Sequence, residues 1–473
     1  MVKQKKINSN SVALKSGIIY GIASIINAGL VFITTPFFTR VMSKNAFGDY
    51  NNFLSWYNIF SVLSLNLYAS FISARRDFKE NYNGYVKSMG IFNFCVLAFF
   101  FIITLAVKKW MTTILGLDVI YVILMYIYIA FYQVFMMFQV NERFEYKYKT
   151  SSIMIIVCAI VTAILSMIGV CVFENQLFGR ILGLVIPTVL AGMISLVIIL
   201  LRNGKFDISY WKYALPICIP YIPHLLSLNI LNSLDKTMIT KMVGSEKTAI
   251  YSVAYVCGSV ISLIVGVLNN AYAPWMTNKF ESNEELQVRK FSKVYVILFE
   301  GILIGILLLT PELVYILGGE RYADAIWIMP SIIIGCAMQL IYTMYVNVEQ
   351  YYKKTGYMAV ISILAAIVNF ILNYICIPIY GYQIAAVTTL LSYLVLALGH
   401  IGILNVLNIK VYEDKLNILV IICNIALIPI FLIAYKYNVI RGTMIVGYLV
   451  IISMLFIRYR NKITKIIKVM IGL

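Results

Sequence analysis

Apolar segments of about 20 residues recur along this chain, separated by short polar connectors. A helix of that length crosses the roughly 30 Å hydrocarbon core of a bilayer. Hydrophobic residues make up 62% of the chain and charged residues only 12%, which excludes an ordinary soluble protein. We therefore expect an all-α polytopic membrane protein with about 14 transmembrane helices, near residues 16–39, 47–73, 88–107, 119–140, 151–173, 181–201, 213–234, 250–276, 294–318, 325–348, 357–379, 383–406, 417–435 and 442–457.

The formal charge of +18 is distributed unevenly between the two sides of the membrane in the expected topology. With the N-terminus inside, the inner connectors and tails hold 27 of the 38 Lys and Arg residues, and the outer connectors hold 11. This bias agrees with the positive-inside rule. We predict a multi-pass protein of the cell membrane with both termini in the cytoplasm, a basic C-terminal tail lying on anionic headgroups, and no nucleic-acid partner.

Two pairs of similar segments indicate an internal repeat. Thr39-Arg40 recurs 201 residues later as Thr240-Lys241, and Tyr50 recurs as Tyr251. The second pair of similar segments, positions 146–150 and 352–355, has an offset of 205 to 206 residues. We predict two six-helix lobes of the same orientation, residues 1–212 and 213–409, followed by a helix pair and basic tail at 410–473.

The chain carries no catalytic or metal-binding signature. It lacks zinc-protease, nucleophile-elbow, Walker and dinucleotide motifs, and its eight cysteines lie in apolar stretches without close pairs. We expect no enzyme activity, no cofactor and no metal, buried unpaired cysteines, and helix-packing hydrogen bonds from His224 and His400.

Several Lys and Arg residues lie near the ends of predicted spans on the outer side, where the positive-inside rule predicts few of them. Snorkelling to the interface explains Lys44. Arg40 and Lys241 hold matched positions in the two halves, and Lys236 lies one turn before Lys241. Two facing cations of this kind could bind a diphosphate or an acidic sugar. For Arg40 and Lys241, snorkelling and anion binding both stay open, and Arg180 lies in a similar position.

Polar stripes run along the first helices of each half. Such stripes are either interhelical contacts or the lining of a hydrated cavity. Their repetition in both halves favours the cavity, so we predict substrate contacts from Asn51, Asn58, Asn229, Asn232, Tyr251 and Tyr255.

Intramembrane acids and prolines are few. Glu300 lies deep in a span and Asp235 near a span end, so both are candidates for ion coupling. Lys293, two turns before Glu300, could instead pair with it. Prolines kink or break helices, and we expect gating kinks at Pro36, Pro216, Pro220 and Pro223.

Pro36, Thr39-Arg40, Gly48-Asp49-Tyr50 and Ser233-Leu234-Asp235-Lys236 together resemble the polysaccharide-transporter branch of the multidrug/oligosaccharidyl-lipid/polysaccharide exporter (MOP) superfamily. The nearest likeness is to Wzx-type flippases of O-antigen and capsule repeat units. The resemblance implies alternating access and a cargo of undecaprenyl-diphosphate oligosaccharide, with membrane lipids, a polysaccharide polymerase and a chain-length regulator as candidate partners in the bacterial inner membrane. It also implies anion binding by Arg40, and less directly by Lys236 and Lys241.

The final helix pair departs from the commoner twelve-span pattern. Fourteen spans also occur in related lipid II flippases and spore-envelope homologues, which leaves the cargo open. The alternatives are a multidrug cation antiporter of the same fold, a membrane polysaccharide polymerase or glycosyltransferase, and a scaffold in a glycan-assembly complex. An antiporter needs acids in its cavity, and a polymerase usually needs a sizeable external loop, which the short outer connectors do not provide.

Overall fold

The computed structural model describes residues 26, 29–145 and 148–471 of the chain, and within these ranges every regular element is helical. The predicted basic N-terminal tail and the first part of the span at 16–39 lie outside the described residues. The elements after the first helix, Gly29–Val41, are α2 Lys44–Phe60, η1 Ser61–Ser64, η2 Leu67–Ser70, α3 Phe71–Asp77, α4 Tyr82–Ala106, α5 Lys108–Leu115, α6 Val119–Phe144, α7 Tyr148–Val172, α8 Gln176–Leu201, α9 Ser209–Cys218, α10 Tyr221–Met242, α11 Ser245–Glu281, α12 Glu285–Leu308, α13 Thr310–Gly318, η3 Glu320–Trp327, α14 Met329–Tyr351, α15 Thr355–Tyr380, α16 Ile384–Val406, α17 Asp414–Lys436 and α18 Asn438–Ile471.

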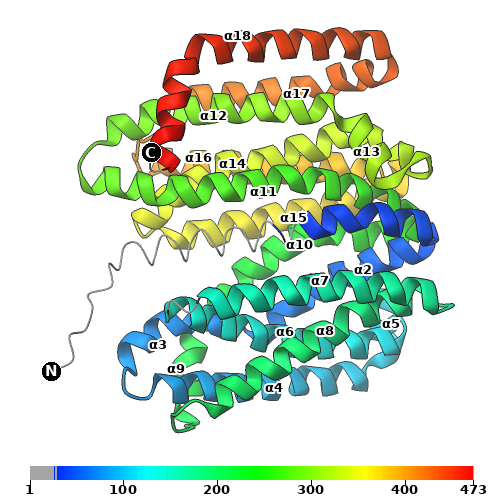
Figure 1. Ribbon diagram of the computed structural model, residues 1–473, viewed down its shortest axis with the longest axis vertical. Helices are drawn as coiled ribbons and strands as arrows, with labels where there is room; N and C mark the ends of the chain where they lie inside the picture. Colours follow the sequence, from blue (N-terminus) through cyan, green and yellow to red (C-terminus); the bar gives the residue numbers. More distant parts are fainter. Residues whose placement is uncertain (1–25, 27–28, 146–147, 472–473) are drawn as a thin grey trace.

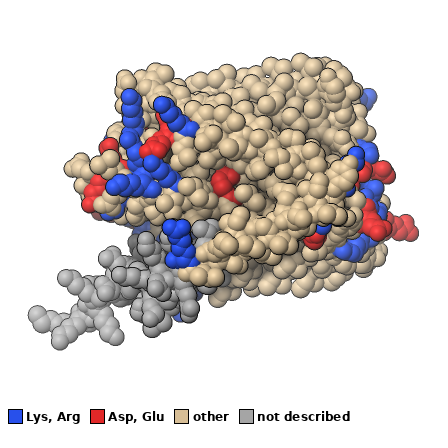
Figure 2. Space-filling model, turned by 90° about the horizontal axis from the view of Figure 1, so that it is seen from above, with Lys and Arg blue, Asp and Glu red and all other residues tan. Residues whose placement is uncertain are grey.

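The expected all-α membrane architecture is confirmed. Ten of the described helices are long and apolar enough to cross a bilayer, and Gly29–Val41 and Asn438–Met454 are shorter apolar helices. Charged side chains gather at the two ends of the molecule and leave a broad, largely uncharged band between them, in which an isolated acidic side chain is visible (Figure 2). This distribution is what a bilayer requires, because a charge in hydrocarbon is costly. The exact total of 14 spans stays a prediction.

The other two predicted spans are interrupted, and the span expected at 294–318 is divided between α12, which ends at Leu308, and α13, which begins at Thr310. A break in the span at 213–234 was expected, and α9 indeed ends at Cys218 and α10 begins at Tyr221, directly after Pro220. The span at 47–73 was expected to be continuous, and that expectation is wrong. Leu65 and Asn66 both adopt left-handed backbone conformations, with φ of 59° and 50°, between two 3₁₀ turns.

Local hydrogen bonds explain the second break. The hydroxyl of Ser61 donates to the carbonyl of Asn58, and that of Ser64 to the carbonyl of Ser61, each at 2.7 Å. Serine hydroxyls that bond to nearby carbonyls offer the backbone an alternative to the helix. Asn66 tolerates the left-handed conformation better than most residues.

The helices run side by side across the view of Figure 1, with the N-terminal half below, the C-terminal half above, and α17 and α18 along the outer edge of the latter. Two clusters of buried apolar side chains lie in the N-terminal half. The largest cluster fills the C-terminal half and also takes in Phe38, Met42 and Phe47. The first helix and the start of α2 therefore pack against the opposite half.

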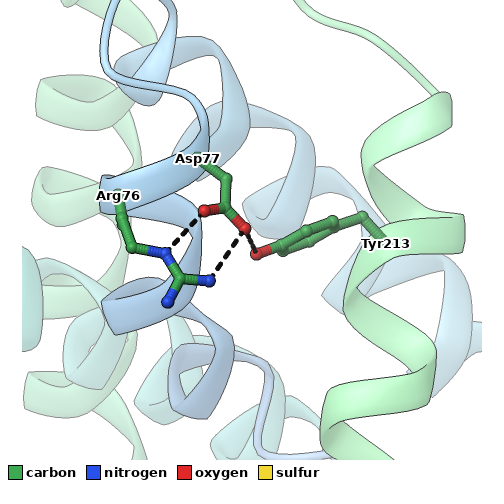
Figure 3. A network of polar contacts seen from close by, with 3 residues as sticks. All are labelled: Arg76, Asp77 and Tyr213. Carbon is green, nitrogen blue, oxygen red and sulfur yellow. Dashed lines mark hydrogen bonds and ion pairs between the residues drawn. The ribbon is translucent and has the colours of Figure 1, made fainter.

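The connection between the halves is divided at the Pro220 break. α9 packs on η2 and α4 in the N-terminal half, whereas α10 packs on α15 in the C-terminal half and on α2. Asp77 at the end of α3 ties α9 in place (Figure 3): it accepts from Arg76 Nε at 2.8 Å and from the Tyr213 hydroxyl at 2.7 Å. These bonds from Arg76 and then Tyr213 hold the pKa of the exposed Asp77 carboxyl below its ordinary value.

Candidate functional site

A cavity of about 620 Å³ lies between the two halves. Its walls come from the first helix, α2, α6, α7 and α8 on one side and from α10 and α11 on the other. Hydroxyl, amide and phenol groups share the wall with apolar side chains; the polar lining residues are Thr34, Thr35, Tyr50, Asn51, Tyr128, Tyr132, Gln139, Arg143, Thr162, Ser166, Arg180, Thr188, Lys236, Tyr255 and Ser259.

The charge of this lining has one sign. Arg143, Arg180 and Lys236 line the cavity, and the residues described around it include no Asp or Glu. Cationic walls in a low-dielectric environment attract anions and repel cations. The cavity is therefore suited to a negatively charged ligand that also presents hydroxyl groups.

Lys236 reaches this cavity from α10. Its Nζ lies 4.4 Å from the centre of the Tyr255 ring on α11, which also lines the cavity. A cation over an aromatic face is stabilised by about 0.5–2 kcal/mol. The Tyr255 hydroxyl has no hydrogen-bond partner among the described residues, so it can serve a ligand.

Asp235, the neighbour of Lys236, points into the C-terminal half instead, because successive helical residues are about 100° apart. Its Oδ2 accepts from the Tyr251 hydroxyl at 2.5 Å and from Thr389 Oγ1 at 2.8 Å. Behind Thr389 lie Asn369 and Asn373, which are both fully buried. Tyr251 thus belongs to a buried polar cluster and not to the cavity wall.

Arg180 enters the cavity one turn after the start of α8. Its Cζ lies 3.6 Å from the centre of the Tyr50 ring and 3.8 Å from that of Phe38, and Nη1 lies 3.3 Å from the sulfur of Met42. Sequence reasoning noted this cation and assigned it no role. The available signal was a charge inside an apolar helix, which is a functional candidate by default.

At the end that carries the loops after the first helix and after α10, contacts between the halves close the cavity. Gly48 meets the backbone of Ser245 so closely that a Cβ atom at position 48 would lie 1.8 Å from the Ser245 carbonyl oxygen. The Ser245 hydroxyl donates to Asp49, and Thr39 donates to the Leu317 carbonyl at 2.5 Å. We call these contacts, together with that of Phe47 and Tyr322 at 6.0 Å between ring centres, the seam.

The structure brings some predicted ligands together and separates others. Lys236, Asn51 and Tyr255 line the cavity. Arg40 is exposed, and its guanidinium donates to the Ile316 carbonyl at 3.2 Å beside the seam. Lys241 is exposed in the last turn of α10. Arg40 and Lys241 thus lie outside the cavity lining, to which Arg180 contributes a cation from the N-terminal half and Lys236 one from the C-terminal half.

The predicted asparagine ligands other than Asn51 bond to neighbouring helices. Asn229 donates to the carbonyl of Asn58 at 2.6 Å and Asn58 donates to the Ser233 hydroxyl at 3.3 Å, so these side chains join α2 to α10. Asn232 accepts from the Tyr393 hydroxyl at 2.5 Å. Their geometry is that of interhelical contacts.

Glu300 lies away from the cavity, at the contact of α12 with α17, where Asn424 donates to it at 3.2 Å. Lys293 pairs with Glu413, so the alternative pairing of Lys293 with Glu300 is wrong. Pro36 lies within the continuous first helix, Pro216 within α9, and Pro223 in the first turn of α10. Among these four prolines, only Pro220 stands at a helix break.

The structure agrees in part with the expectations for the cysteines and histidines. All eight cysteines are free, as expected, but Cys95, Cys171 and Cys423 are exposed and not buried. His400 makes the expected packing bond, with Nδ1 2.8 Å from Glu349 Oε1. The side chain of His224 lies outside the described part of the structure. Within the described part, no group of acidic, Cys and His side chains could hold a metal ion.

Residues 13–280 match the family described as "Polysaccharide biosynthesis protein". No curated protein sequence matches the chain.

Solved structures share the fold at low sequence identity. The lipid II flippase MurJ in an inward closed conformation aligns with a TM-score of 0.70 and 13% identity over 94% of this chain and 100% of that chain. An inward-facing multidrug resistance MATE family transporter of the MOP superfamily aligns with a TM-score of 0.56 and 12% identity over 84% and 99%. A MOP superfamily transporter from Pyrococcus furiosus aligns with a TM-score of 0.50 and 13% identity over 84% and 97%.

Proposed function

Because the chain belongs to the polysaccharide biosynthesis protein family and has the fold of MOP superfamily transporters, we propose that it is a lipid-linked oligosaccharide flippase. Its cargo is an undecaprenyl-diphosphate-linked repeat unit, moved from the cytoplasmic to the outer leaflet of the bacterial inner membrane. The exported glycan is a surface polysaccharide such as O-antigen or capsule.

The observation that carries this proposal is the charge of the cavity wall. Three cations and no described acid line it, together with hydroxyl, amide and phenol groups. A diphosphate carries charge that cations bind, and a sugar headgroup cannot cross hydrocarbon without polar partners. Lys236, Asn51 and Tyr255 are the predicted ligands that this wall supports.

Alternating access provides the transport mechanism. We propose that residues 1–212 and 213–409 move as two lobes and that 410–473 form an accessory helix pair. The charge bias of the connectors supports cytoplasmic termini and a position of the seam on the outer side. The cavity then receives cargo from the inner leaflet while the seam is closed, and it releases cargo outwards when the seam opens.

We assign ion coupling to Asp235. This acid is fully buried next to the cavity cation Lys236, and its Oδ1 has no partner among the described residues. Binding of a proton or a cation there would change the balance of charge beside the cargo site. Asp235→Asn should then abolish export at normal protein level, whereas Glu300→Gln, at the periphery, should retain it.

A multidrug cation antiporter of the same fold is the second candidate, since MATE transporters align over most of the chain. A cationic cavity whose described lining contains no acid argues against cationic drugs as its substrates. A polymerase needs a catalytic centre outside the membrane, and the outer connectors are short. A polysaccharide polymerase and a chain-length regulator remain candidate partners.

A deletion strain tests the function. If the proposal holds, undecaprenyl-diphosphate oligosaccharide accumulates in the cytoplasmic leaflet and surface polysaccharide is lost. Normal surface polysaccharide with new sensitivity to cationic drugs would support the antiporter. Repeat units that reach the outer leaflet but stay unpolymerised would support a polymerase.

A further inference from the structure

Arg180 has hydrogen-bonding capacity that no other described side chain uses. The residue is only 8% exposed, its Nε has no hydrogen-bond partner, and no ion pair with an acid forms within the described part of the chain. Its bond to the sulfur of Met42 is weak, because a thioether is a poor acceptor. A buried, unpaired cation on a cavity wall calls for an anionic partner.

Three aromatic rings surround the guanidinium, and we call them the cage. Tyr50 and Phe38 lie within 4 Å of Cζ, and the Phe47 ring centre lies at 5.0 Å. Rings at this distance attract the charge of the guanidinium. The cage compensates that charge in part, and the Nε–H group still has no acceptor among the described residues.

The cage is also part of the seam. Phe47 contacts Tyr322 in the C-terminal half, and the next residue, Gly48, touches the backbone of Ser245. Phe38 precedes Thr39, which donates to the carbonyl of Leu317. The side chains that hold Arg180 therefore belong to the segments that close the cavity.

We propose that Arg180 binds the diphosphate group of the lipid-linked cargo at the closed end of the cavity, and that this binding loosens the seam. The inference rests on the proposed flippase function and deepens it. A phosphate bound at the edge of the guanidinium neutralises its charge, and the cation–π attraction to the cage rings then weakens. The cage then holds the first helix and α2 together less tightly, and the seam opens only when cargo is present.

Binding to the purified full-length protein in lipid nanodiscs tests the first part. Farnesyl diphosphate is the probe, with inorganic pyrophosphate in a parallel series. Arg180→Gln should weaken farnesyl diphosphate binding by at least about tenfold and Arg180→Lys by less, since Lys keeps the charge but loses the bidentate fork. Arg321→Gln is the matched control, because it removes an exposed cation outside the cavity lining.

Hydrogen exchange at residues 42–50 and 244–250 tests the second part. Farnesyl diphosphate should speed exchange at these segments in the wild type and leave Arg180→Gln unchanged. Phe38→Leu removes a cage ring and keeps the cation, so it should speed exchange without ligand while binding the probe at least as tightly. This second variant does not depend on Arg180→Gln folding well.

The outcomes separate the two proposals. Equal binding by wild type and Arg180→Gln would overturn the role of Arg180 and leave the flippase standing. Binding of pyrophosphate that depends on Arg180, without binding of farnesyl diphosphate, would keep the anion site and reject the lipid-linked cargo. Loss of binding in Arg180→Gln with unchanged exchange in the wild type would overturn the link to the seam.

Discussion

Gly48→Ala is expected to prevent the seam from closing. The new Cβ atom would lie 1.8 Å from the Ser245 carbonyl oxygen, and ordinary contact begins at 3.4 Å, so the two helix starts must separate by 1.6 Å. Overpacking of this kind costs about 1–3 kcal/mol. The separation also breaks the bond of Ser245 to the Asp49 carboxylate, and a bond to a charged group contributes about 1.5–3 kcal/mol.

Together these losses amount to about 3 kcal/mol, which lowers the population of the closed seam by roughly 100-fold. Helix propensity works in the other direction, because Ala in a helix interior is favoured over Gly by about 1 kcal/mol. Gly90→Ala is therefore the matched control. It brings the same propensity gain, and its Cβ atom would lie 3.7 Å from the nearest heavy atom, Leu196 Cδ1.

Two measurements check this prediction. Surface polysaccharide should be lost in Gly48→Ala at normal protein level and retained in Gly90→Ala. Cys158 lines the cavity, so a membrane-impermeant thiol reagent added outside should label it faster in Gly48→Ala. Peptide mapping distinguishes it from the exposed Cys171. If both variants export polysaccharide and label like wild type, the seam is not the outer gate.

Three further predictions address charge and stability. Lys236→Gln should reduce export about tenfold or more while Lys236→Arg retains most of it, because a charge-assisted contact contributes about 1.5–3 kcal/mol; equal export at matched protein levels would contradict the role. Glu349→Ala leaves the buried His400 without its partner and should lower the free energy of unfolding by about 1–3 kcal/mol, with Glu349→Gln costing less; equal losses in denaturation would refute this. Asp77→Asn should lower the melting temperature above about pH 4 and lose its effect at lower pH, because the Asp77 carboxyl has a pKa below its ordinary 3.8 and its bond to Tyr213 weakens as it becomes protonated; a pH-independent difference between wild type and variant would contradict it.

Hydropathy determined the fold class because it reports how each segment partitions into a bilayer, and that depends on the segment alone. The break at Pro220 was expected from the proline itself. Pro36, Pro216 and Pro223 lie within helices, so the sequence alone did not determine which proline breaks its helix. The break at Leu65 and Asn66 could be predicted from the sequence only in part. Ser61 and Ser64 are local competitors for helix carbonyls, but serines of this kind also occur inside unbroken helices.

The residues of the cavity could not be predicted from local sequence in this way. Arg40 and Arg180 look alike in the sequence, each an arginine near the end of an apolar segment, yet Arg40 faces the Ile316 carbonyl outside the cavity and Arg180 lines it. Asp235 and Lys236 are adjacent, and only the helices packed around α10 decide that the acid meets Tyr251 while the cation meets Tyr255. The direction of a side chain along its own helix follows from the sequence. What that direction meets is set by the helices that pack against it, some of them more than a hundred positions away in the chain. The chain alone therefore determined a helical membrane protein and predicted two related halves, and tertiary packing decided which cations share its cavity.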